Sequence, residues 1–280
     1  MPVRLGPRQL TLFLAREIVR DWFVRAHSLC LRPTRLCRGF PKPLHSSASL
    51  GMTKTKRLLL FDIDSTLVAT LGAGVKALQQ IIERRYGVQD DLSDIEIAGR
   101  TDVTIAANIL RKYRIEPTRE NLGAFLDEYV AGLAKLLPQL QGWVLPGIRK
   151  ILERLKPRPD RVLALLTGNL RRGAELKLTR YGLWEFFEFG AFADDHHDRN
   201  ELGTFARQRA QEKHGHDFDS AQIDVIGDTG HDIACGKAFG ARTIAVGTGI
   251  WSGERLQACH PDFFFEDFSD VDGVIDTLGW

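Results

Sequence analysis

Six short segments of the chain are apolar at nearly every position, and this pattern limits the fold more than any other feature. Strands buried on both faces give continuous apolar runs, whereas strands with one solvent face alternate apolar and polar residues. Longer stretches with helical patterns separate the runs, which is typical of a parallel sheet covered by helices on both sides. The sequence therefore predicts an α/β fold. The predicted strands are residues 58–61, 162–166, 187–192, 223–226, 243–246 and 263–265.

About a hundred residues without a convincing strand separate the first two apolar runs. Helical patterns fill this interval, and Pro146 and Gly147 mark the return to a further helix at residues 148–155. The other predicted helices are residues 75–86, 103–113 and 120–137. An insertion of this size after the first strand predicts a separate all-helical cap domain. The chain is then divided into an N-terminal extension, 1–51, an α/β core, 52–70 and 148–280, and a helical cap, 71–147.

Positive charge is concentrated in the N-terminal extension, although the whole chain carries only +2. Residues 1–51 have a formal net charge of +7, and the remaining residues have a formal net charge of −5. The acidic character of the larger part argues against a nucleic-acid-binding protein. The extension is rich in Arg and Pro and resembles an organellar transit peptide. Met52, however, is followed almost at once by the first predicted strand, so we favour an upstream sequence read in frame.

Hydropathy and cysteine spacing indicate the cellular compartment in which the protein is expected. No apolar run approaches the ~20 residues that a membrane-spanning helix needs. The four cysteines form no Cys-x-x-Cys pair, which favours a reducing compartment over a disulfide framework. We therefore expect no membrane partner and a cytoplasmic location, or an organellar one if residues 1–51 are a real transit peptide.

Acidic and small polar residues follow three of the predicted strands directly. They are Asp62 and Asp64 after the first strand, Thr167, Gly168 and Asn169 after the second, and Asp228 and Asp232 after the fourth. The carboxyl ends of parallel strands meet at one edge of the sheet, so these residues come together. Carboxylates held close together need a cation, and a hydroxyl followed by amides at a helix start can bind an anion. The combination predicts a site for Mg²⁺ and a phosphate.

The order of these residues resembles the haloacid dehalogenase superfamily. Its four motifs correspond to Asp62-x-Asp64-x-Thr66, Thr167, a basic residue, and Gly227-Asp228-x-x-x-Asp232. The resemblance runs from about residue 57 to the end of the chain. It implies a Rossmann-like parallel sheet core, and the helical insertion after the first motif resembles the cap of the phosphoglycolate phosphatase-like branch.

The resemblance also implies roles for the acidic residues. Asp62 would be the nucleophile that forms an aspartyl-phosphate, and Asp64 the general acid and base. Mg²⁺ would be held by Asp62, Asp228 and the backbone carbonyl of Asp64. Asp232 would support the site by orienting the basic residue or a metal-bound water. Ser65 stands where the superfamily usually has glycine, in a turn that can require close backbone approach.

Phosphate binding is implied for the second and third motifs. Thr167 and the amides of Gly168 and Asn169 would bind the phosphoryl oxygens. The superfamily most often has lysine in the third motif, whereas the best-placed basic residue here is Arg199. Arginine keeps the charge but has a different reach, and Lys213 is the rival candidate.

The resulting hypothesis is a Mg²⁺-dependent phosphatase that hydrolyses a small phosphomonoester and is phosphoglycolate phosphatase-like. Asp64 supports phosphoryl transfer, because the haloacid dehalogenases themselves lack this second aspartate. A sugar-phosphate mutase of the same superfamily is the main enzymatic alternative. A phosphoacceptor signalling domain is the alternative from another class, although it would lack the cap and the acid–base partner. The expected partner is a small phosphorylated metabolite, and the protein is expected to be a monomer or homodimer.

Arg100 is the candidate for substrate specificity. It lies in the loop of residues 97–102 between two predicted cap helices, where the superfamily places substrate-selecting residues. Its guanidinium could pair with a carboxylate or second anionic group on the substrate. A salt bridge within the cap, to Asp102 or Glu96, is the alternative interpretation.

Overall fold

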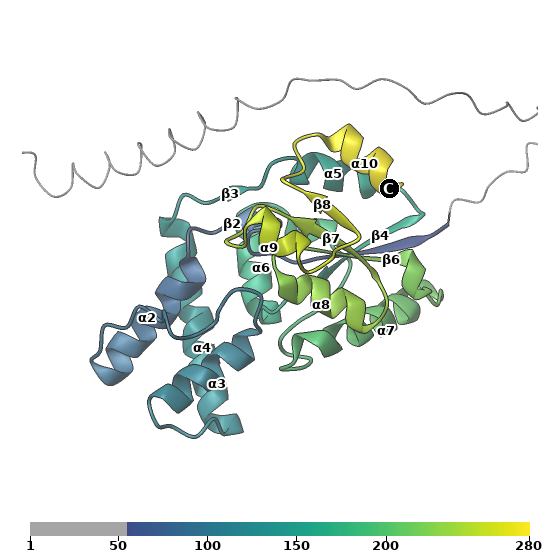
Figure 1. Ribbon diagram of the computed structural model, residues 1–280. Helices are drawn as coiled ribbons and strands as arrows, with labels where there is room; N and C mark the ends of the chain where they lie inside the picture. The colour runs from purple at the N-terminus through teal and green to yellow at the C-terminus, as the bar shows by residue number, and fades with distance from the viewer. Residues whose placement is uncertain (1–54) are drawn as a thin grey trace, which may run out of the picture. The chain divides into compact units, whose positions relative to one another are not determined.

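The computed structural model describes residues 55–280, so the predicted N-terminal extension, residues 1–51, lies outside the described residues. A six-stranded parallel sheet lies at the centre of this part (Figure 1), with the strand order β5-β4-β1-β6-β7-β8. The strands are β1 Arg57–Phe61, β4 Arg161–Leu166, β5 Gly190–Ala191, β6 Ile223–Gly227, β7 Arg242–Val246 and β8 Phe263–Phe265. All six predicted strands are present, which confirms the α/β class. β5 is shorter than predicted and lies at the sheet edge, paired only with β4.

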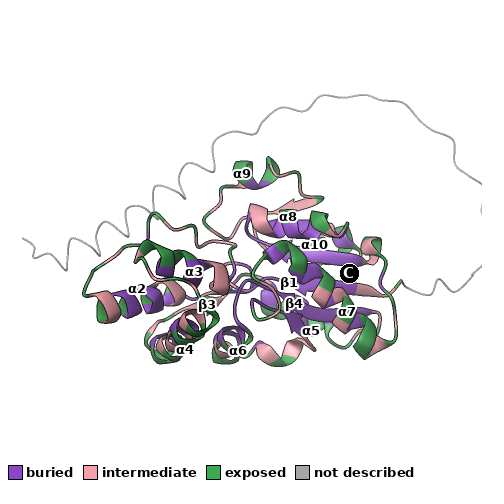
Figure 2. Cartoon of the chain, turned by 90° about the horizontal axis from the view of Figure 1, so that it is seen from below, coloured by how far each residue is buried: buried purple, intermediate pink, exposed green. Residues whose placement is uncertain are grey.

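Alternate residues of β1 face opposite sides of the sheet. Leu59 and Phe61 belong to an apolar cluster with helices α5, α6 and α10, and Leu58 and Leu60 to a cluster with α7 and α8. These helices are α5 Ile148–Leu155, α6 Arg171–Arg180, α7 Leu202–His214, α8 Gly230–Ala238 and α10 Val271–Leu278. Figure 2 shows β1 and β4 as buried between them. Burial on both faces explains why the strands are apolar without alternation.

Three helices between β1 and β4 pack on one another beside the sheet (Figure 1). They are α2 Ala73–Tyr86, α3 Asp102–Lys112 and α4 Arg119–Leu136. Thr101 and Thr118 begin α3 and α4, because each side chain accepts a hydrogen bond from a backbone amide three residues later. These helices lie within the predicted cap domain, 71–147. From here on, the cap means the three helices and the loops between them, residues 73–136.

Two chain segments connect the cap to the sheet. They contain the two-residue strands β2 Val68–Ala69 and β3 Trp143–Val144, which pair in antiparallel fashion. The sequence predicted no strand here, because two residues are too short to show a periodic pattern. Gly147 ends the second segment with φ 76°, and a Cβ at this position would lie 1.6 Å from the Phe268 carbonyl oxygen. This turn therefore requires glycine.

The remaining elements are short. They are helix α9 Gly253–Gln257 and the 3₁₀ turns η1 Leu137–Gln139, η2 Trp184–Phe186, η3 Arg199–Glu201 and η4 Ser220–Gln222. Among residues 55–280, no helix combines the length and the apolar character that crossing a bilayer requires.

Candidate active site

The carboxyl ends of β1, β4 and β6 lie side by side. β1 pairs with both other strands, and Asp62, Thr167 and Asp228 follow β1, β4 and β6 directly. The strand order reverses beside β1, because the chain adds β4 and β5 on one side and β6, β7 and β8 on the other. α/β proteins with such a reversal bind ligands there. The structure therefore brings the three strand-end motifs to one place.

Three buried carboxylates form an acidic group at this edge. Asp62, Asp228 and Asp232 each have an oxygen within 4.8 Å of the others. Burial raises the pKa of Asp62 to about 6, against the opposing charge of Arg199. Burial, reinforced by the neighbouring carboxylates, also raises the pKa of Asp228 well above its ordinary value. A cation would offset the cost of ionising Asp62 and Asp228, so these two carboxylates fit the predicted Mg²⁺.

Asp232 holds the basic residue and the start of α8 in place. One of its carboxylate oxygens accepts hydrogen bonds from the amide and hydroxyl of Thr229, at 3.0 and 2.6 Å. Its other oxygen accepts from Arg199. A Cβ at Gly227 would lie 2.0 Å from the Asp232 carboxyl carbon, so this approach requires glycine before Asp228.

Arg199, rather than its rival Lys213, reaches the acidic group. The buried Arg199 guanidinium donates through Nη2 to Asp62, at 3.0 Å, and through Nη1 to the Gly99 carbonyl of the cap, at 3.1 Å. Lys213 is half exposed and donates to the Glu188 carbonyl at 3.1 Å. Arginine thus bridges the core and the cap at the position predicted for the third motif.

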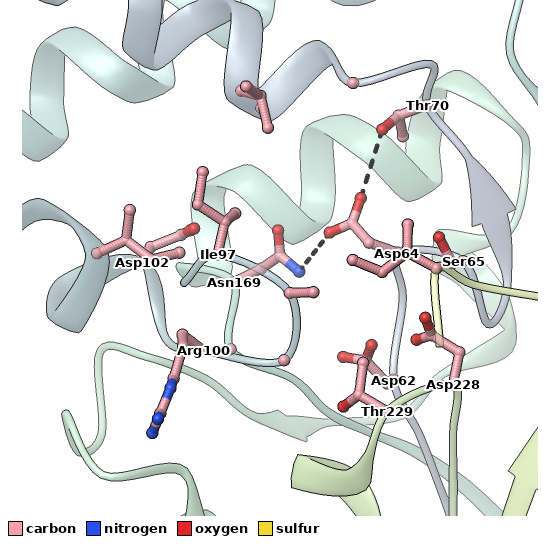
Figure 3. A pocket seen from close by; sticks show the side chains of 18 of the residues that line it. Asp62, Asp64, Ser65, Thr70, Ile97, Arg100, Asp102, Asn169, Asp228 and Thr229 are labelled. Carbon is pink, nitrogen blue, oxygen red and sulfur yellow. Dashed lines mark hydrogen bonds between the residues drawn. The ribbon is translucent and has the colours of Figure 1, made fainter. Parts of the chain in front are cut away.

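Asp64 belongs to a second polar group, on the cap side of Asp62 (Figure 3). Its Oδ2 accepts from Lys177 Nζ at 2.5 Å and from Asn169 Nδ2 at 3.0 Å, and its Oδ1 accepts from Thr70 at 3.4 Å. Partial burial would raise the pKa of Asp64, but the ion pair and hydrogen bonds hold it below its usual value. The two aspartates of the first motif therefore have opposite pKa shifts.

Lys177 is a site residue that the sequence analysis missed. Its side chain is 3% exposed, and Nζ also donates to Asn169 Oδ1 at 2.6 Å. It lies on the buried face of α6, together with Ala174 and Leu178. A lysine on the apolar face of a helix that begins just after Asn169 was the available signal, because a buried ammonium needs a nearby carboxylate.

The turn Thr167-Gly168-Asn169 connects the two polar groups. The Asn169 side chain donates to the Thr167 hydroxyl at 2.8 Å as well as to Asp64, and Thr167 directly follows the strand beside β1. A Cβ at Gly168 would lie 2.2 Å from the Arg100 carbonyl oxygen. The cap loop therefore lies directly on this turn, which requires glycine.

Arg100 contacts the site through its backbone. Its Nε and Nη2 donate to Glu96 Oε2 at 2.8 and 2.5 Å, and Figure 3 shows its guanidinium turned away from Asp62 and Asp228. This salt bridge is the alternative interpretation considered for the residue. Its predicted part in substrate specificity stays a prediction.

Ser65 has the backbone conformation for which glycine is usual. Its φ is 59°, in the left-handed region, and its carbonyl accepts a hydrogen bond from Thr248 at 2.5 Å. The departure from glycine noted in the sequence is therefore accommodated, with this contact holding the turn.

A pocket of about 440 Å³ lies between the cap and the strand ends. Its core side includes Asp62, Asp64 and Arg199, and its cap side includes Val75 and Tyr129. The site is therefore lined by side chains of both the core and the cap.

Comparisons with known proteins agree with this geometry. A family model described as "Haloacid dehalogenase-like hydrolase" matches residues 59–246. The probable phosphatase IndB of Dickeya dadantii is 29% identical over 227 residues, which are 80% of this chain and 95% of that protein. A phosphoglycolate phosphatase of Vibrio parahaemolyticus is 23% identical over 226 residues, which are 78% of this chain and 96% of that protein.

A solved structure has the same fold. CbbY from Rhodobacter sphaeroides, in complex with phosphate, superposes with a TM-score of 0.63 at 17% identity. The match covers 78% of this chain and 96% of that one.

Proposed function

Because the chain belongs to the haloacid dehalogenase-like hydrolase family, we propose that it hydrolyses a small phosphomonoester with Mg²⁺, through an aspartyl-phosphate on Asp62. The observation that carries the proposal is the acidic group of Asp62, Asp228 and Asp232 around Arg199, at the core side of the pocket. A bound cation would compensate the negative charge of these carboxylates, and a phosphoryl group would accept hydrogen bonds from Arg199.

The phosphoryl group would lie against Arg199 and the turn after β4. Arg199 Nε is buried and has no hydrogen-bond partner among residues 55–280. A buried donor of this kind is costly unless a ligand supplies an acceptor. The Thr167 hydroxyl and the amides of Gly168 and Asn169 lie at the neighbouring strand end and would bind the other phosphoryl oxygens.

The carboxylates of Asp62 and Asp228, with the backbone carbonyl of Asp64, would hold Mg²⁺. When bound, the ion supplies positive charge that lets two anionic groups approach each other. Asp232 stays outside this ligand set, because Thr229 and Arg199 already occupy its two oxygens.

Two displacements at phosphorus complete the reaction. An Asp62 oxygen bonds to phosphorus as the ester P–O bond breaks, and the leaving alcohol oxygen takes the proton that Asp64 must carry for this step. Water then bonds to phosphorus, gives a proton to Asp64 and displaces the Asp62 carboxylate. Lys177 and Asn169 position the Asp64 carboxylate for both transfers.

Phosphate release from p-nitrophenyl phosphate tests this proposal. The full chain is assayed with Mg²⁺ and with EDTA, beside the variant Asp62→Asn. We expect repeated turnover that needs Mg²⁺, and a loss of more than about 100-fold in Asp62→Asn, because an amide cannot act as the nucleophile. The melting temperature of Asp62→Asn should stay close to that of the parent chain, since the two side chains are nearly isosteric.

Two results would contradict the proposal. Activity of Asp62→Asn within about tenfold of the parent would place the nucleophile elsewhere. A single phosphorylation without further phosphate release would indicate a phosphoacceptor domain.

A further inference from the structure

The part of the pocket beyond Asp64 is the space that a leaving group would occupy. It is walled mainly by the cap, whereas the acidic group and Arg199 lie at the opposite end. Its aliphatic lining residues are Leu71, Val75, Leu78, Ile97, Ile105 and Ile250. These aliphatic side chains would bury an apolar group and cannot form hydrogen bonds with it.

Two of these aliphatic residues are themselves exposed. Ile250 is 80% exposed and Leu71 is 45% exposed, although both are large and apolar. Both line the pocket. Exposed apolar side chains gathered at a pocket indicate a surface that an apolar ligand covers.

The cations around the pocket are already paired with carboxylates. Lys177 is bound to Asp64, and Arg199 is bound to Asp62 and Asp232. Arg100 is bound to Glu96 and turned away from the pocket (Figure 3). Within residues 55–280, every lysine and arginine that lines this pocket is therefore already ion-paired with a carboxylate of the protein.

Asp102 adds a carboxylate to the cap side of the pocket. Its Oδ2 accepts a hydrogen bond from the Leu170 amide at 2.8 Å. Burial raises the pKa of Asp102 to about 6, so the group is ionised at neutral and higher pH. An anionic leaving group would face this charge, and Lys177, the cation that acts on Asp102, is already paired with Asp64.

We infer that the substrate is the phosphate ester of an uncharged, mainly apolar alcohol, and that Asp102 selects against leaving groups that carry a carboxylate or a second phosphate. This inference rests on the proposed phosphatase activity. It runs against a phosphoglycolate-type substrate, whose leaving group is a small carboxylate.

Matched esters test the selectivity of the full-length protein. Ethyl phosphate and phosphoglycolate have leaving groups of similar size that differ in charge, n-butyl phosphate extends the apolar part, and pyrophosphate has an anionic leaving group. With Mg²⁺ at pH 7.5, we expect kcat/KM for phosphoglycolate and for pyrophosphate to be at least about tenfold below that for ethyl phosphate. The value for n-butyl phosphate should be about tenfold above that for ethyl phosphate.

Asp102→Asn isolates the effect of the charge. The amide oxygen can still accept the hydrogen bond from the Leu170 backbone, so the contact between the cap and Leu170 is kept. We expect kcat/KM for phosphoglycolate to rise about tenfold, and that for ethyl phosphate to stay within about twofold. Asp91→Asn is the matched control, because exposed Asp91 also accepts a backbone amide, that of Ser93, but does not line the pocket.

The outcomes separate the inference from the proposed function. Failure to release phosphate from every ester, including p-nitrophenyl phosphate, would overturn the phosphatase proposal itself. If the protein turns over these esters but its kcat/KM for phosphoglycolate or pyrophosphate equals that for ethyl phosphate, only the inference about the leaving group is overturned. An equal increase in kcat/KM for phosphoglycolate in Asp91→Asn and Asp102→Asn would show that Asp102 does not select the leaving group.

Discussion

Two aspartates separated by one residue have opposite electrostatic surroundings. Asp62 lies among buried carboxylates, which together with burial raise its pKa to about 6, whereas Lys177 and Asn169 hold the pKa of Asp64 below its usual value. Asp62 is paired with Arg199 but also lies beside Asp228, with which it could share a cation, whereas Asp64 is paired with an ammonium group. Different surroundings of this kind separate the roles of neighbouring acidic residues.

Lys177→Met tests how far the buried lysine controls Asp64. Without the ammonium the pKa of Asp64 should rise, so the step that needs ionised Asp64 would require a higher pH. We expect the acid limb of the kcat–pH profile to move up by about one unit or more, with a lower kcat at pH 6.

Lys213→Met is the control, because Lys213 is surface-exposed and lies outside the site. Its profile should match that of the parent chain. A lower kcat for Lys177→Met with an unmoved acid limb would give Lys177 a purely structural role.

At the scale of elements, glycines shape both the site and the connection to the cap. Gly168 lets the cap loop rest on the turn after β4, and Gly147 lets the second connecting segment pass the Phe268 carbonyl. The paired strands β2 and β3 join the two connecting segments to each other. The geometry of the connection is thus set by backbone contacts that a side chain would block.

Gly147→Ala should be strongly destabilising, and Gly87→Ala only mildly so. Both glycines have positive φ, of 76° and 66°, which costs an alanine about 1 kcal/mol. Only Gly147 adds a backbone clash, whereas nothing lies within 4 Å of a Cβ at Gly87. We expect losses in the free energy of unfolding of about 3 kcal/mol or more for Gly147→Ala and about 1 kcal/mol for Gly87→Ala.

Urea unfolding measured on both variants checks the comparison. Equal losses would show that the chain near Gly147 relaxes away from Phe268 and that the close approach is not required.

For the whole molecule, the cap and the parallel sheet enclose a site that neither part forms alone. The cap contributes the Gly99 carbonyl to Arg199 and the Asp102 carboxylate to the Leu170 amide. The family match confirms the predicted haloacid dehalogenase superfamily, and the matched curated relatives include phosphatases.

Mg²⁺ should stabilise the whole protein more at pH 7.5 than at pH 5. The pKa of Asp62 in the folded protein lies above its ordinary value, so protonation stabilises the metal-free fold, and this contribution is lost as the pH rises through about 6. Mg²⁺ replaces the lost protons at high pH but competes with them at low pH. At a concentration of about 100 times Kd the gain at pH 7.5 should be about 2.7 kcal/mol.

Thermal unfolding with Mg²⁺ or EDTA at both pH values measures this effect. Asp228→Asn should abolish most of the Mg²⁺-dependent rise in Tm. An equal rise at both pH values, or an undiminished rise in Asp228→Asn, would show that the ion binds elsewhere.

The sequence alone determined the strands, the cap helices and the strand-end residues, because apolar periodicity and helix capping are local patterns. It also indicated the family, since the motifs keep their order along the chain. The tertiary structure decided which charged groups meet. It paired Arg199, and not Lys213, with Asp62, brought buried Lys177 to Asp64, and turned Arg100 toward Glu96. Ion pairing depends on distances across the fold, and Lys177 lies 113 residues from Asp64 in the chain, so no local pattern could assign that pair.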